Sequence, residues 1–311
     1  MIPPGTSLDD LATVAGLAWA VEKEALYTAS LLPVPKHVAL IRQDTMAVLG
    51  VVGRDYGPVQ NQTLVDTLTA LGRLARVTPE SGGSLLGGRI VWLLARVDGL
   101  GFRIGQDEHE GFLLLTNSHD GQRPLTIGPT TLRVVCANTL ALAQRQIRTR
   151  IAAEGAGVAT GYQVRHTRSA EIQVADIQLA LAEAVATNRR TSELARYLAG
   201  IPSSAALERQ FFQRVFALPD GASESDRAIT MRKNREERLQ RILASPTSRV
   251  DGTSGSAYAL VQAAIEYVDH ERPTRTQEGQ AANEARLCSA VFGSGADTKS
   301  KAWGTIQELV R

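Results

Sequence analysis

The spacing of hydrophobic positions predicts one helix and one hairpin in the first 60 or so residues. A weak helical stripe runs through the N-terminal segment and predicts a helix ended by Pro33 and Pro35. Its members are Leu8, Leu11, Ala15, Ala18 and Val21. Residues 37–42 and 46–52 are two apolar runs around the turn residues 43–45, and they predict two hairpin strands.

The next segment changes to a 3.6-residue period. Asn61 is a good N-cap for a helix whose apolar positions are Leu64, Val65, Leu68, Leu71 and Ala75. We expect this helix to end before Pro79 and the following residues 81–84, Ser-Gly-Gly-Ser, to form a loop.

Three runs rich in Ile, Val, Leu and Phe then predict an antiparallel meander of strands. They cover residues 89–97, 111–117 and 122–127, with turns expected at Asp98-Gly99 and Asp120-Gly121. Residues 131–151 return to helical spacing, and residues 162–167 predict a short strand. The predicted fold is therefore α+β, an antiparallel sheet made of a hairpin and a three-strand meander with packed helices.

The second half of the chain has mainly helical patterns. Helices are expected over about 170–199, 205–216, 226–245 and 257–268, followed by two weaker ones. We predict an α+β core domain over residues 1–168 and a mainly helical region over 169–311, with a linker near the Ser-, Thr- and Gly-rich residues 246–256.

Composition excludes several classes of protein. Apolar residues make up 43% of the 311 residues and charged residues 21%, which favours a packed core over a disordered chain. No apolar run approaches the ~20 residues of a membrane span, and the N-terminus has no signal-peptide pattern. Cys136 and Cys288 are too few for a disulfide framework or a four-cysteine zinc site. We therefore expect a cytoplasmic protein without membrane association.

The net charge of +2 hides a strong preference for arginine. Of 34 basic residues five are lysines, so 29 are arginines, whose planar forks suit phosphates and stack on bases. A GC-rich genome also produces such a composition. Residues 144–168 hold five arginines and one acid, a local excess of +4. We interpret these arginines as phosphate contacts, although a solvated helix end has the same pattern: Arg145, Arg148, Arg150, Arg165 and Arg168.

A second basic cluster lies between residues 232 and 241. It contains Arg232, Lys233, Arg235, Arg238 and Arg241. Their spacing of about three spreads them around a helix, and Glu236 and Glu237 stand four residues from Arg232 and Lys233. This pattern favours ion pairs within the helix over a binding surface.

Among the few aromatic residues, Tyr56 and Tyr162 are the candidates for base stacking. Tyr56 is beside Gly57-Pro58, and Tyr162 is next to the first basic cluster.

Two polar stretches are candidates for catalysis or metal binding. Residues 117–121, Asn-Ser-His-Asp-Gly, place a nucleophile, a base and a carboxylate side by side, but consecutive residues point in different directions and the string is typical of a tight turn. Residues 107–110, Asp-Glu-His-Glu, could ligate a cation, although short acidic loops are usually solvated. We assign no catalytic residue, no metal and no cofactor.

Several long strings together identify a family resemblance. They include IRQDTMAVLGVVGRDYGPVQN (41–61), GGRIVWLLARV (87–97), FLLLTNSHDG (112–121), TLRVVCANTLALA (131–143), VRHT (164–167), AIEYVDHE (264–271) and FGSGADTKSKAW (292–303). In this order the chain resembles the phage/plasmid-like family catalogued as domain-of-unknown-function family 932. The resemblance spans about residue 17 to the end and implies a mobile-element context, but no catalytic residues.

The predicted order of strands and helices also resembles the core of Rad52-type single-strand annealing proteins, a resemblance of topology and not of motif. We therefore expect a non-enzymatic DNA-associated protein that binds and anneals single-stranded DNA as a homo-oligomer. The alternative is a protein–protein interaction factor that modulates a host protein, such as a defence or restriction component. A third class is an enzyme built on Asp107, His119 and Asp120.

Overall fold

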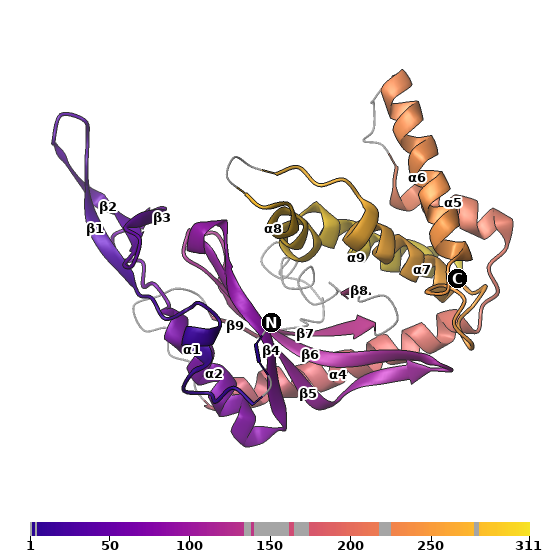
Figure 1. The fold of residues 1–311 in the computed structure, drawn as a ribbon, viewed down its shortest axis with the longest axis horizontal. Helices are drawn as coiled ribbons and strands as arrows, with labels where there is room; N and C mark the ends of the chain where they lie inside the picture. Colours follow the sequence, from indigo (N-terminus) through magenta and orange to yellow (C-terminus); the bar gives the residue numbers. More distant parts are fainter. Residues whose placement is uncertain are drawn as a thin grey trace. The chain divides into compact units, whose positions relative to one another are not determined.

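The computed structural model describes residues 2–3, 5–133, 138–139, 162–164, 174–217, 225–276 and 280–311. The fold is α+β, as predicted, with two antiparallel sheets in the N-terminal half and mostly helices from residue 174 onwards (Figure 1). The chain forms two compact units, and each is described by itself. The first contains residues 1–100, 111–129 and 155–186, and the second contains 101–110, 130–154 and 187–311. Residue 168, the expected domain boundary, lies outside the described residues.

The first sheet has three strands, β1 (Val21–Tyr27), β2 (Pro33–Arg42) and β3 (Ala47–Gly53), in that order. The hairpin expected around residues 43–45 is confirmed, since His37 to Arg42 pair with Gly53 to Ala47. The helix expected in the first 30 or so residues is wrong beyond its start. Helix α1 covers only Leu11–Val14, because the backbone from Val21 onwards pairs with β2 and this pairing overrides a weak helical pattern.

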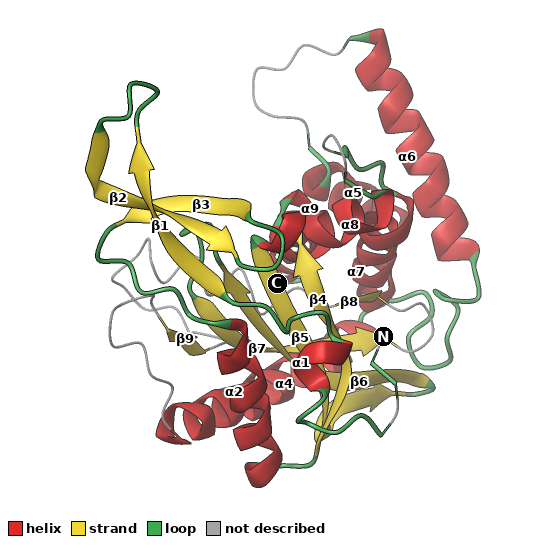
Figure 2. Ribbon diagram, turned by 60° about the vertical axis from the view of Figure 1, so that its left-hand side comes forward, coloured by secondary structure: helices red, strands yellow, loops and turns green. Residues whose placement is uncertain are grey.

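The second sheet has the order β4-β5-β6-β7-β8, with β9 paired to β7. Its strands are β4 (Val77–Leu85), β5 (Ile90–Ile104), β6 (Asp107–Ser118), β7 (Leu125–Arg133), β8 (Asn138–Thr139) and β9 (Tyr162–Val164). The three-strand meander and the short strand at 162 are thus confirmed. Figure 2 shows these strands separately from the β1–β3 sheet.

Three local predictions in this sheet are wrong. The expected loop at 81–84 belongs to β4, where Gly82 pairs with Leu93, and a Cβ at Gly82 would lie 2.5 Å from the Leu93 Cδ2 atom. Strand β5 continues through Asp98-Gly99, and the chain reverses instead between β5 and β6, at Gly105 with φ +55°. The helix expected from residue 131 does not begin there, because β7 runs to Arg133 and pairs with β8.

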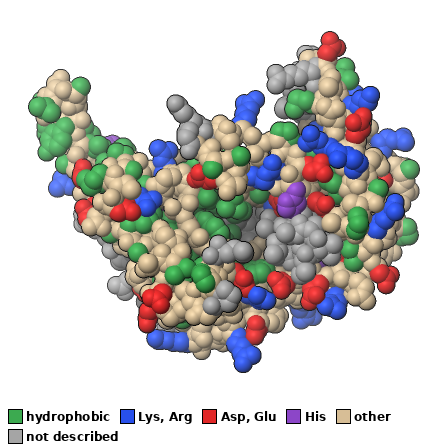
Figure 3. All heavy atoms as spheres, in the orientation of Figure 1, with side chains coloured by type: hydrophobic (Ala, Val, Ile, Leu, Met, Phe, Trp, Pro, Cys, Tyr) green, Lys and Arg blue, Asp and Glu red, His purple; other side chains and the backbone are tan. Residues whose placement is uncertain are grey.

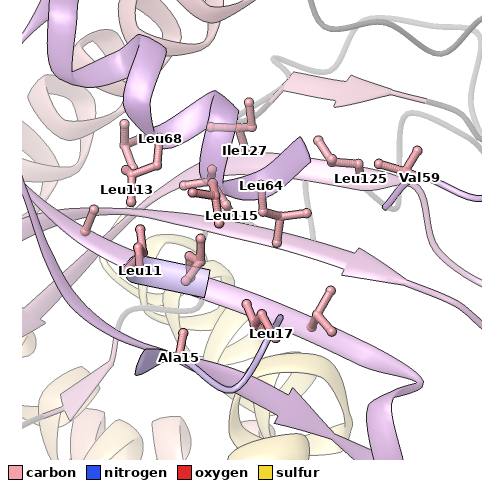
Figure 4. Close-up of a cluster of buried hydrophobic side chains, with 14 of the residues drawn as sticks. Leu11, Ala15, Leu17, Val59, Leu64, Leu68, Leu113, Leu115, Leu125 and Ile127 are labelled. Atoms are coloured by element: carbon pink, nitrogen blue, oxygen red, sulfur yellow. The ribbon is translucent and has the colours of Figure 1, made fainter. Parts of the chain in front are cut away.

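Helix α2 (Asn61–Leu74) confirms the predicted helix and covers the first core (Figure 4). Its apolar stripe, Leu64, Val65, Leu68 and Leu71, is buried together with residues of α1 and of the second sheet. Leu113, Leu115, Leu125 and Ile127 alternate along β6 and β7 and supply the sheet side of this core. Helix α4 (Val174–Ala199) begins in this unit and contributes Ile177, Ala180 and Ala184.

The second unit is built around a central helix, α7 (Ala257–Glu266), which is buried on nearly every side. Around it lie the predicted helices α5 (Ala205–Val215) and α6 (Asp226–Ala244), and the C-terminal helices α8 (Ala282–Leu287) and α9 (Ser294–Leu309). Two π-helical turns, η2 (Tyr267–Glu271) and η3 (Cys288–Phe292), extend α7 and α8. Residues 246–256 form turns inside this unit, where Ser248, Thr253 and Ser256 are buried.

A buried ion pair joins η2 to α9. The Nζ of Lys299 donates to Oδ1 of Asp269 at 2.7 Å, and the two side chains are 1% and 6% exposed. Burial lowers the pKa of the Lys299 ammonium group, and the Asp269 carboxylate opposes that shift. In the described part of the chain, no helix is long and apolar enough to cross a bilayer.

Candidate nucleic-acid interface

The predicted site residues fall into two groups. The five arginines of the first basic cluster, Arg145, Arg148, Arg150, Arg165 and Arg168, lie outside the described residues, so their role stays a prediction. Tyr162 is placed only by its backbone, which pairs with Ile127 in β9. Tyr56 is half-buried against the first core. Burial raises the pKa of its hydroxyl, and the Asp120 carboxylate raises it further.

Residues 117–121 form the end of β6 and the bend that follows it, and their side chains make buried contacts. His119 Nε2 lies 2.8 Å from Oδ1 of Asn61, and Nδ2 of Asn117 donates to the Val59 carbonyl at 2.9 Å. The Ser118 hydroxyl donates to the Arg123 carbonyl at 3.0 Å. Each of the three side chains is therefore committed to a buried structural contact.

Asn61 has a role that its sequence position did not suggest. The predicted N-cap is wrong, since Gln60 caps α2 and makes no side-chain cap bond. Asn61 is 1% exposed, and its Nδ2 donates to the carbonyls of Leu17 and Trp19. The edge of the His119 ring also meets Trp19, at 5.5 Å between ring centroids. This network ties the N-terminal segment to α2 and to the end of β6.

Residues 107–110 do not assemble as one set of metal ligands. They alternate along β6, so Asp107 and His109 are buried while Glu108 faces outwards and pairs with Arg103 at 2.9 Å. His109 stacks on Phe102, and its Nε2 forms a hydrogen bond with the Tyr258 hydroxyl. Among the described residues there is no group of three or more His, Cys, Asp or Glu side chains able to hold a metal ion.

The residues of the suggested enzyme are also not adjacent. Asp107 begins β6 and His119 directly follows its end. The whole of β6 therefore stands between Asp107 and His119 along the chain.

Helix α6 differs from its prediction in a way that matters for binding. It carries six basic residues and three acids, a net charge of +3. Two of its arginines make contacts beyond the helix, since Arg241 pairs with Glu271 at 3.7 Å and Arg238 donates to the Glu271 carbonyl. Arg232, Lys233, Glu236 and Glu237 are exposed. Figure 3 shows the basic side chains gathered along this helix.

A groove of about 1010 Å³ runs between α5 and α6. Each helix lines it with a stripe of residues three or four apart, so one face of each helix is turned to the groove. The apolar lining includes Phe212 of α5, Phe216 at the C-terminal cap of α5, and Met231 and Leu239 of α6. Arg209 and Arg232, both exposed, lie among the lining residues of the two helices.

Arg235 links the charged and aromatic parts of this lining. Its guanidinium carbon lies 5.1 Å from the centroid of the Phe216 ring, within the range of a cation–π contact. Burial lowers the pKa of Arg235, but arginine stays charged under all ordinary conditions. Phe216 in turn stacks on Phe212 at 6.5 Å. The groove thus offers a guanidinium plane above an aromatic ring, and its lining contains three arginines and two acids, Glu208 and Glu236.

The comparison with protein families decides the relationship of the chain. A family model described as "Domain of unknown function (DUF932)" matches residues 48–291. The chain belongs to the DUF932 family. The DUF932 match includes β3 from Val48 onwards, α7 and both helices of the α5–α6 groove. No curated protein and no solved structure matches the chain.

Only part of the groove can be predicted from the sequence. Arg232 and Arg235 belong to the second basic cluster, but the sequence analysis does not identify Phe212 and Phe216 as site residues. Their spacing of four, which places both on one face of a helix, was the available signal. The groove itself depends on how α5 packs beside α6, which no local pattern specifies.

Proposed function

We propose that this DUF932 protein binds single-stranded DNA in the α5–α6 groove, as a non-enzymatic DNA-associated protein. The observation that carries the proposal is the combination of Arg209, Arg232 and Arg235 with the aromatic pair Phe212–Phe216 in one groove. Single-strand binders combine a basic groove that follows the backbone with planar side chains that stack on bases. Nucleotide bases stack on the plane of an arginine guanidinium group as they do on an aromatic ring.

The roles of the lining residues follow from their chemistry. Arg209 and Arg232, exposed on separate helices, are suited to phosphate oxygens. The guanidinium plane of Arg235, already held over Phe216, is suited to stack on a base. The groove volume of about 1010 Å³ is at the upper end of the ~300–1,000 Å³ typical of ligand pockets, so it has room for more than one nucleotide base.

Single-stranded DNA suits this lining better than a duplex does. A base pair hides its faces in the stack, whereas unpaired bases can turn an apolar face towards Phe216 and Met231. The arginines of residues 144–168 remain candidates for further phosphate contacts in the same complex. Annealing of two strands is the activity that we propose for the bound state.

A salt-dependent titration with matched variants tests the proposal. A labelled thymidine oligonucleotide is titrated at several salt concentrations with the wild type, Arg232→Ala and Lys233→Ala. Arg232 lines the groove, while its neighbour Lys233 is exposed on the same helix and does not. We expect Arg232→Ala to weaken binding and to reduce the slope of log K against log [salt] by about 0.7, the value for one lost phosphate contact on a single strand.

Lys233→Ala should change neither affinity nor slope by a comparable amount. Arg209→Ala and Arg214→Ala form a second matched pair, since Arg209 lines the groove and Arg214 does not. Equal losses in the lining and the control variants would point to general charge attraction and contradict the groove. Binding that is micromolar or weaker, without a salt slope, would remove the DNA-binding proposal altogether.

A further inference from the structure

Strand β3 is an edge strand with an unusual composition. In the described sheets it pairs with β2 on one side only. Its sequence, Ala-Val-Leu-Gly-Val-Val-Gly, contains no charged residue and no proline. Val48 and Val51 on this strand are 56% and 55% exposed. Exposed apolar edge strands are templates for pairing with another chain, and proteins normally protect them.

The opposite edge of the same sheet is protected. Strand β1 carries Glu22, Lys23 and Glu24 in succession, and all three side chains are exposed. Charged residues on an edge strand discourage pairing with a further strand. Among the described residues, one edge of this sheet is therefore charged, while the other is apolar and is interrupted only by a bulge opposite Leu40 and Ile41.

We infer that β3 pairs with β3 of a second copy of this chain, in antiparallel orientation about a two-fold axis. The occupant follows from the composition of the strand, because every position from Ala47 to Gly53 is apolar or glycine. Antiparallel pairing of two such strands brings valine and leucine together and places no like charges opposite each other. Two three-stranded sheets then form one continuous six-stranded sheet.

The two-fold arrangement also explains why a single open edge is enough. An isologous contact uses the same surface on both copies and closes after two, so no further edge is left to extend the assembly. The guarded strands β1 end up at the outer edges of the joined sheet. Because β3 and the α5–α6 groove are different surfaces, this inference goes beyond the DNA-binding proposal and does not depend on it.

Light scattering after size-exclusion chromatography tests this contact by comparing the oligomeric state of the wild type with that of three variants. We expect the wild type to be a dimer. The Val48→Lys/Val51→Lys variant should raise the dimer dissociation constant at least about tenfold, because each lysine occurs in both copies. Val185→Lys on α4 is the matched control, since Val185 is 54% exposed, and it should leave the dimer intact. Circular dichroism of each variant checks that the fold is retained.

The tip of the β1–β2 hairpin provides a second control. Leu31 and Leu32 are 81% and 63% exposed there, and Figure 3 shows hydrophobic side chains at this tip. A dimer that Leu31→Lys/Leu32→Lys dissociates and Val48→Lys/Val51→Lys does not would overturn the assignment to β3. A wild type that stays monomeric at all concentrations, with or without a captured host protein, would overturn it too.

Cysteine cross-linking tests the pairing itself. Single cysteines are placed in turn at positions 47–53 in a Cys136→Ser/Cys288→Ser background and exposed to mild oxidation. An antiparallel pair about a two-fold axis predicts one position of maximal dimer cross-linking, with weaker yields on either side, because disulfides need Cβ atoms about 3.5–4.5 Å apart. Uniformly absent cross-links contradict the pairing. Oligonucleotide titration of the Val48→Lys/Val51→Lys variant shows separately whether the groove still binds.

Discussion

Replacing Lys299 with methionine should destabilise the protein strongly. The substitution keeps the length of the side chain but removes the ammonium group that donates to Oδ1 of Asp269 at 2.7 Å. Asp269 is 6% exposed, so its carboxylate would lose the Lys299 charge while it stays buried. Breaking a buried pair in this way typically costs about 3–5 kcal/mol, which is a large share of a total stability of about 5–15 kcal/mol.

Urea unfolding followed by circular dichroism measures this effect. We expect Lys299→Met to lower the free energy of unfolding by about 3–5 kcal/mol and the melting temperature by roughly 10 °C. Lys301→Met, on the same helix at an exposed position, should change stability by less than about 0.5 kcal/mol.

The double variant Lys299→Met/Asp269→Leu should recover most of the loss, because no unpaired charge stays buried. The reasoning would be refuted by a single variant as stable as Lys301→Met. A double variant no more stable than Lys299→Met would show that the loss arises from packing and not from the carboxylate.

Three further predictions concern residues singled out by the sequence. Burial raises the pKa of Tyr56 in the folded state, so its contribution to stability is complete below about pH 10, the pKa in the unfolded chain, and is lost as the pH rises beyond it. Between pH 8 and about pH 10.5, the melting temperature of Tyr56→Phe should therefore fall less than that of the wild type. Asn61→Ala should lower the free energy of unfolding by about 2–4 kcal/mol in urea, since it leaves buried carbonyls without donors, whereas Gln62→Ala at the next, exposed position should cost far less. Replacing all five arginines of the first basic cluster with alanine should reduce the salt slope of oligonucleotide binding by more than Arg232→Ala alone does. An unchanged slope would show that these residues are not part of the interface. They are Arg145, Arg148, Arg150, Arg165 and Arg168.

The sequence predicted those elements whose signal is local. The stripe Leu64, Leu68 and Leu71 specified α2, and the apolar runs on either side of residues 43–45 specified a hairpin. The failures came from contacts between distant residues. Gly82 has the composition of a loop but lies in a strand close to Leu93, and Val21 belongs to a helical pattern but pairs with Arg42.

In the candidate site, too, the sequence predicts local features but not the contacts between distant residues. Arg232 and Arg235 could be named from charge alone, but ion pairs along the helix were the expected outcome. The pairing of Arg241 with Glu271, 30 residues further along the chain, is a contact that the spacing of charges within the helix does not predict. His119 and Asn61, 58 residues apart, form a buried contact that no spacing rule identifies.

Photo-cross-linking tests the central claim most directly. Single-stranded DNA carrying a photoreactive base is irradiated with the wild-type protein, and the modified peptides are identified by mass spectrometry. Binding in the α5–α6 groove predicts adducts on the apolar lining, at Phe212, Phe216 or Met231, that weaken in Arg232→Ala and persist in Lys233→Ala. Efficient cross-linking with no adduct between residues 205 and 240 would contradict the account.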